Sequence, residues 1–147
     1  MEYTEGKLGR VFVARLHEGE SIYQAVEEIA MREGIEAAAV LALGGMRSGS
    51  VVTGPESPTG NFVPHCEEFH DAREFVGAGT LFLQAGEPSL HFHAGIGRGK
   101  ESRVGCPRVG MSVYLVLEVV IIELLGINAQ RELDLETCSY LLSILNP

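Results

Sequence analysis

Apolar and polar residues alternate along several stretches of this 147-residue chain, and alternation at a period of two is typical of β-strands. Residues 9–16 (GRVFVARL) show this pattern and are rich in β-branched and aromatic side chains. Residues 36–53 contain an apolar strand, a bend or bulge at Gly44-Gly45, and a second strand. Further strands are expected over residues 74–84, 90–94 and 111–126. The pattern predicts about six or seven strands.

The segment after the first strand changes to helical spacing. Its apolar residues recur at i, i+3, i+4, i+7 and i+8, namely Ile22, Ala25, Val26, Ile29 and Ala30. Ser21 and Gln24 have the spacing of a capping box, and Gly34 follows where a C-terminal cap belongs. We expect one amphipathic helix that packs on the sheet.

These elements predict the fold class. One helix, hairpin-length connections and no alternation of strands with helices favour an α+β domain with a mostly antiparallel sheet. The chain is 46% hydrophobic and of single-domain length, so we expect one domain over residues 1–147. Residues 54–64 hold three prolines and two glycines, which predicts the longest surface loop there.

Charge and cysteine content narrow the functional classes. Eleven basic and twenty acidic residues give a formal charge of −9, which disfavours nucleic-acid binding. Three cysteines, with no C-x-x-C pair, argue against a disulfide framework and favour a reducing, cytoplasmic location. No signal peptide is evident, and the most apolar run, residues 114–125, is too short to cross a bilayer.

The stretch SLHFHAGIGRG, residues 89–99, carries the most interesting chemistry. On a strand, His91 and His93 point to the same face, while Leu90, Phe92 and Ala94 point to the other. Two imidazoles side by side are typical of a metal site, and a catalytic zinc ion takes three protein ligands. The spacing leaves two interpretations open: a metal site, or two polar residues on a solvated face.

The third ligand has three candidates. Cys106 ranks first, because a hairpin turning through residues 95–99 would return it toward the histidines. His65 and His70 are the alternatives. They belong to the segment HCEEFHD, which is either a second metal-binding site or the solvated edge of a loop.

Other polar residues are candidates for substrate contacts or catalysis. The alternating glycines of residues 95–99 lack the pattern of a dinucleotide-binding loop and predict a turn. Arg98 and Arg108 could neutralise an anionic substrate or decorate a solvated loop. Glu118 and Glu123 interrupt one apolar strand on opposite faces, and Glu118, deeper in the run, is the candidate general base or interface residue.

Four motifs, in order, resemble a known family. GRVFVARLHEGESI, REFVGAGTLF, EPSLHFHAGIGRG and VYLVLEVVIIEL together are similar to the plants-and-prokaryotes conserved domain, a domain of unknown function, over nearly the whole chain. The resemblance implies an α+β domain that assembles as a homotrimer. Its fold is similar to that of acetolactate decarboxylase, a zinc enzyme, although shared fold does not transfer function.

The resemblance also bears on the site. Prokaryotic members look like metal-site proteins whose third ligand lies near a Gly-Gly-His segment. Here that segment is Val104-Gly105-Cys106-Pro107-Arg108, which lacks the histidine, and Cys106 is the proposed substitute. Plant members carry AT-hook segments that bind DNA, and this chain has none.

Two classes of function follow. The first is a trimeric domain that holds zinc, or another divalent transition metal, through His91, His93 and Cys106, and acts on a small oxygen-rich substrate. The alternative is a protein-interaction or DNA-associated regulatory module without catalysis.

Overall fold

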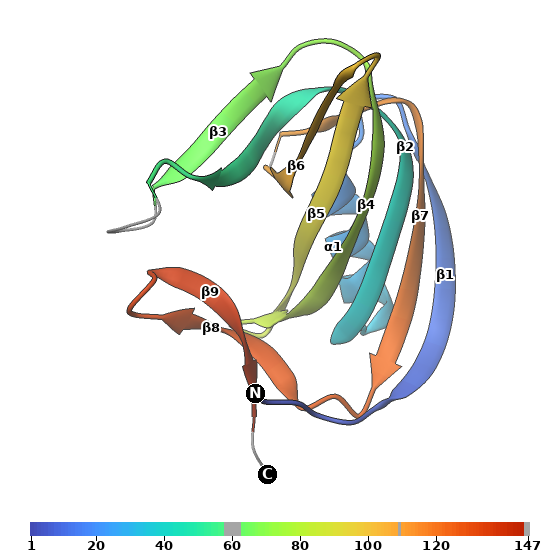
Figure 1. Ribbon diagram of the computed structural model, residues 1–147. Helices are drawn as coiled ribbons and strands as arrows, with labels where there is room; N and C mark the ends of the chain where they lie inside the picture. Colours follow the sequence, from blue (N-terminus) through green and yellow to red (C-terminus); the bar gives the residue numbers. More distant parts are fainter. Residues whose placement is uncertain (58–62, 109, 146–147) are drawn as a thin grey trace.

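The computed structural model describes residues 1–57, 63–108 and 110–145 (Figure 1). These residues form one helix, α1 (Ile22–Glu33), and nine strands. The strands are β1 (Lys7–His17), β2 (Ala37–Pro55), β3 (Pro64–Phe69), β4 (Arg73–Gln84), β5 (Glu87–Arg98), β6 (Glu101–Pro107), β7 (Ser112–Leu125), β8 (Ala129–Asp134) and β9 (Ser139–Ile144). In the described part of the chain, no helix has the length and apolarity needed to cross a membrane.

The predicted fold class is wrong. In place of an α+β domain with six or seven strands, the chain is mostly β, with nine strands in one mixed sheet and a single twelve-residue helix. The sheet is mixed because β8 runs parallel to β4. Strands β3, β8 and β9 have only six residues each. Strands β3 and β8 are mostly polar, and the apolar residues of β9 are consecutive, so none of the three shows a clear alternation.

Strand ends also differ from the predictions. Strand β5 continues through Gly95 and Gly97, so the predicted turn at residues 95–99 is wrong, and the hairpin turns at Gly99-Lys100. The predicted loop 54–64 is partly strand, because β2 reaches Pro55 and β3 begins at Pro64. Residues 58–62 of that predicted loop lie outside the described residues.

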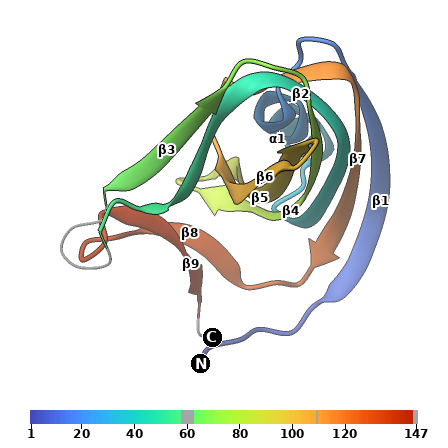
Figure 2. The same ribbon diagram turned by 45° about the horizontal axis from the view of Figure 1, so that its top comes forward.

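The long strand β2 organises the sheet. Its first half pairs with β4 and β7, and its second half pairs with β3 and β6. Because β4 pairs with β5 and β5 with β6, the strands β2, β4, β5 and β6 close into a ring (Figure 2). Gly105 permits the closure, since a Cβ there would collide with the carbonyl oxygen of Val52.

The helix prediction is confirmed, but the capping box is not formed. Helix α1 ends at Gly34, whose left-handed conformation (φ 67°) directs its N–H to the carbonyls at the helix end. Ser21 makes no side-chain cap, and its hydroxyl is buried without a hydrogen-bond partner. One face of α1 packs into the core through Ile22, Val26 and Ala30.

Alternation along the strands separates a core face from an outer face. Phe92 of β5 is fully buried, and its ring is stacked on Phe75 at 5.7 Å between centroids. Beneath it lie Gly77 and Gly79 of β4, where any Cβ would collide with the Phe92 ring. The motif VGAGT therefore leaves room for the aromatic ring between the two histidines, whose side chains are on the outer face.

Candidate metal-binding and ligand-binding cleft

The two histidines of β5 lie side by side, as their spacing predicts. The two Nε2 atoms are 3.1 Å apart, and the ring centroids are separated by 5.0 Å. Leu90, Phe92 and Ala94 are buried on the opposite face, which fixes the strand that carries both rings. The pair is thus oriented by the core packing beneath it.

This spacing fits two ligands of one metal ion. Zinc binds histidine nitrogens at about 2.0–2.1 Å in tetrahedral geometry, which places two such nitrogens about 3.3 Å apart. The observed 3.1 Å is close to that value. A single strand therefore holds two imidazole nitrogens at a distance that would suit two ligands of one metal ion and that, without a metal, is a hydrogen bond between the rings.

Cys106 approaches the pair without joining it. The β5–β6 register pairs Ala94 with Gly105, and one further step would set Cys106 opposite His93. At that step β6 leaves β5, and Cys106 pairs with Val52 of β2 instead. Within residues 1–57, 63–108 and 110–145, no three His, Cys, Asp or Glu side chains cluster closely enough to hold a metal ion.

His91, His93 and Cys106 line a common cleft of about 680 Å³. One wall comes from β5, β6 and the end of β2, and the other from the β8–β9 hairpin, which faces them across the opening (Figure 1). The remaining lining residues are Val52, Thr53, Gly54, Val104, Gly105, Arg108, Thr137, Ser139, Tyr140 and Leu141. The volume and the mixture of apolar and hydroxyl-bearing side chains suit a small organic ligand.

The electrostatics of the cleft are unlike those of the whole chain. None of the described residues that line it is an Asp or Glu, whereas the chain carries a formal charge of −9. Loss of water around His91, followed by the positive charges of Arg131, His93 and Arg108, lowers the pKa of its imidazole. A lowered pKa keeps the ring neutral at pH 7, which is the form that binds metal.

Two predicted residues lie elsewhere. Arg98 is paired with Asp71, with 3.0 Å between Nη1 and Oδ2, and it lines a different depression. Glu118 is exposed on β7 and does not line the cleft; in register it faces Leu43 of β2. Of the residues predicted for the site, His91, His93, Cys106 and Arg108 line the same cleft. Arg98 and Glu118 do not. Glu123, the other glutamate of β7, is paired with Arg10, which donates to its carboxylate through the backbone N–H, Nε and Nη2.

The two alternative third ligands are also distant from the pair. His65 lies on β3, where its Nδ1 is 2.9 Å from Glu56 Oε1, and His70 is 3.5 Å from Glu68. Neither lines the cleft. The segment HCEEFHD is largely strand β3 and not a loop, but His65, Cys66, Glu68 and His70 are exposed, as the solvated-edge interpretation expects.

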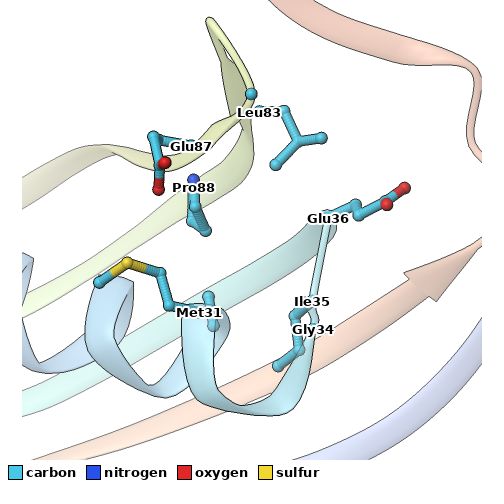
Figure 3. Close-up of a pocket in the computed structure, with 9 residues that line it drawn as sticks. Met31, Gly34, Ile35, Glu36, Leu83, Glu87 and Pro88 are labelled. Atoms are coloured by element: carbon cyan, nitrogen blue, oxygen red, sulfur yellow. The ribbon is translucent and has the colours of Figure 1, made fainter.

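A second, smaller pocket lies between the C-terminal end of α1 and the β4–β5 turn (Figure 3). Its volume is about 250 Å³, and its lining includes Met31, Leu83 and Pro88. The charged residues that line it are Glu36 and Glu87, with no histidine, cysteine or arginine. This pocket therefore lacks the metal-binding and cationic side chains that line the larger cleft.

Sequence analysis did not identify Arg131 or the β8–β9 hairpin. Arg131 is only 7% exposed, and its Nη2 donates to the Thr80 carbonyl and hydroxyl oxygens at 2.9 and 3.0 Å. The hairpin had one local signal, Asp134 three residues before Thr137. The Asp134 carboxylate accepts hydrogen bonds from the Thr137 N–H and hydroxyl, which is a turn preference of Asp.

Comparison with known proteins decides the family. The sequence model of one protein family, the Plants and Prokaryotes Conserved domain, matches residues 3–125. This chain belongs to the Plants and Prokaryotes Conserved domain family. The resemblance inferred from the four motifs is confirmed. The β8–β9 hairpin, which supplies one wall of the cleft, lies beyond the matched residues.

Solved structures share the fold of this family member. A metal-containing protein from Archaeoglobus fulgidus has 24% identity and a TM-score of 0.84, covering 96% of this chain and 98% of its own. A plant- and prokaryote-conserved protein from Pyrococcus horikoshii has 21% identity and a TM-score of 0.79, with coverage of 95% and 96%. A candidate DNA-binding protein from Ralstonia eutropha has 18% identity and a TM-score of 0.75, covering 90% of each chain. No curated protein matches the chain significantly.

Proposed function

We propose that this Plants and Prokaryotes Conserved domain binds a divalent transition metal, zinc by preference, at His91 and His93, and acts on a small oxygen-rich ligand in the cleft. The observation that carries the proposal is the 3.1 Å separation of the two Nε2 atoms on one strand. The related protein from Archaeoglobus fulgidus, described as metal-containing, supports it. When bound, such a metal supplies a Lewis acid that polarises a ligand oxygen.

The third ligand in this proposal is Cys106. Its thiol is part-buried, and the residue lines the same cleft. One more pair in the β5–β6 register, beyond Ala94 and Gly105, would set Cys106 opposite His93. A shift of the last β6 residues from β2 toward β5 would bring the thiolate to the pair. Arg108, also in the cleft wall, would neutralise charge on the ligand.

We also propose that the chain assembles as a homotrimer, as the family resemblance implies, in the cytoplasm. An uncovered apolar face supports self-association. Val13 of β1, Leu41 and Leu43 of β2, and Val76 of β4 lie on the outer face of neighbouring strands and are 49–77% exposed. An exposed apolar patch of this kind typically marks an interface. Leu43→Arg should yield monomers in light scattering, whereas Met31→Arg on α1 should leave the trimer intact.

Metal content tests the proposal. Protein purified without an affinity tag is compared with the His91→Ala/His93→Ala double variant by elemental analysis. We expect about one metal ion per chain in the wild type and none in the variant, with both folded and of equal size. Equal metal content in the two proteins would refute the site.

Cobalt(II) substitution tests the third ligand. A thiolate ligand gives an intense charge-transfer band that histidine and water do not give, and Cys106→Ser should abolish it while Cys66→Ser should not. If the wild type shows no such band, Cys106 is not a ligand. A folded trimer that binds no metal would favour the protein-interaction alternative, for which the same apolar face is the supporting observation.

A further inference from the structure

Arg131 is a buried cation without a counter-ion. The residue is 7% exposed, its Nε is buried without a hydrogen-bond partner, and no carboxylate of the described residues lies within 4 Å of its guanidinium nitrogens. Its contacts are the Thr80 oxygens and the face of the Phe82 ring, 5.8 Å away. Burying an unpaired charge is costly, so buried guanidinium groups in proteins are normally paired.

The position of this cation relates it to the histidines. Thr80 of β4 is the register partner of His91 on β5, and directly opposed residues of an antiparallel pair have Cβ atoms about 5 Å apart on the same face. The Arg131 Nη2 is 3.0 Å from the Thr80 hydroxyl oxygen. The guanidinium therefore lies beside His91 on the outer face, at the side of the cleft where the β8–β9 hairpin meets the sheet.

The cleft offers an anion more than one positive group. Arg108 lines it, and none of its described lining residues is an Asp or Glu. Arg131 is not itself a lining residue, but it contacts Thr80, the register partner of the lining residue His91. The hydroxyls of Thr137 and Ser139 also line the cleft, but each already donates a hydrogen bond within the hairpin, to Asp134 and to the Thr137 carbonyl respectively. The other cations of this region are already neutralised: Arg73 and Arg98 bind Asp71, and Arg103 binds Glu67.

We propose that the cleft binds a small organic carboxylate whose negative charge is held by Arg131, with Arg108 as the second cation. The Nη1 atom of Arg131 makes no hydrogen bond to the described residues, and a carboxylate accepts strong, charge-assisted hydrogen bonds from such a donor. Val52, Val104 and Leu141 supply an apolar wall for the rest of the ligand. This inference rests on the proposed function, because it names the class of the oxygen-rich ligand. It requires no metal for binding, so the two can be tested separately.

Calorimetric titration with malonate tests the proposal, with malonamide as the neutral probe of similar size and inorganic phosphate as the alternative anion. We expect malonate to bind more tightly than either, and to bind more weakly at high salt. Arg131→Gln should weaken malonate binding at least tenfold, because the amide keeps a donor for Thr80 but loses the charge. Arg131→Lys keeps the positive charge but not the guanidinium group. Its affinity for malonate should therefore lie between those of the wild type and Arg131→Gln.

Arg98→Gln is the matched control, because it removes the same charge from an arginine that lines a different depression and is already paired with Asp71. It should leave malonate binding unchanged. The titration is repeated on the His91→Ala/His93→Ala variant, which lacks the metal ligands. Binding that survives there but fails in Arg131→Gln supports the carboxylate site even if the metal proposal fails.

Three results would overturn the inference. They are equal malonate affinity in the wild type and Arg131→Gln, equal losses in Arg98→Gln and Arg131→Gln, and tighter binding of phosphate than of malonate. Because Arg131 also anchors the hairpin, each variant is checked by amide shifts of Thr137 and Ser139. If Arg131→Gln displaces the hairpin, Arg108→Gln decides, since unchanged affinity in that variant also contradicts the two-cation site.

Discussion

Phe92 connects the packing of the core to the geometry of the histidine pair, and truncating it is the sharpest test of that link. Its side chain is fully buried and stacked on Phe75, with an interplanar angle of 8°. Phenylalanine-to-alanine substitutions in cores cost about 3–5 kcal/mol. A domain of this size has about 5–15 kcal/mol of stability in total. Phe92→Ala should therefore remove a large part of the free energy of unfolding.

Urea denaturation followed by circular dichroism measures this loss, at several protein concentrations so that any effect of assembly is visible. The midpoint should fall with little change in the dependence on urea. Met31→Ala, at an exposed position of α1, should change stability by less than about 0.5 kcal/mol. A loss below about 1 kcal/mol for Phe92→Ala would refute the view that this ring anchors β5. The double variant with Phe75→Ala should show a coupling of about 0.5–1.5 kcal/mol.

Three further predictions concern backbone and charge. Gly77→Ala should cost about 1–3 kcal/mol in urea denaturation, because its Cβ would collide with Phe92; a neutral result would contradict the close packing. Gly34→Ala should cost about 1 kcal/mol, because only its positive φ opposes a side chain there; a loss as large as that of Phe92→Ala would point to a packing role instead. Hydrogen bonds from Arg10 lower the pKa of Glu123 from 4.5 to about 2, so the stability from this pair is complete above pH 4.5 and is lost as the pH falls toward 2. Acid titrations of unfolding should show a shallower fall for Arg10→Met than for the wild type over that window, and parallel curves would argue against the pair.

The strongest local patterns predicted their elements well. The helix of residues 22–33 follows from apolar spacing and from Gly34, and the shared face of His91 and His93 follows from strand alternation alone. Both depend on neighbouring residues only. The fold class failed because β3, β8 and β9 are short and lack a clear alternation, and because β8 pairs with β4, which is distant in sequence.

The candidate site shows the same division. Cys106 was expected near the histidines from the hairpin, and it does line their cleft, but its pairing with Val52 depends on how β2 closes the ring. Arg131 carried no local signal, because its importance comes from burial against Thr80 and Phe82, about 50 residues earlier in the chain. The spacing of residues along the sequence does not predict contacts between segments this far apart.

The proposed function depends on a metal ion held by His91 and His93. The most direct test is a crystal structure of protein grown with zinc, with anomalous diffraction measured at the zinc edge. We expect one anomalous peak per chain, about 2.0–2.1 Å from both Nε2 atoms. A fully loaded crystal whose only peaks lie elsewhere, for example beside His65 or His70, would contradict it.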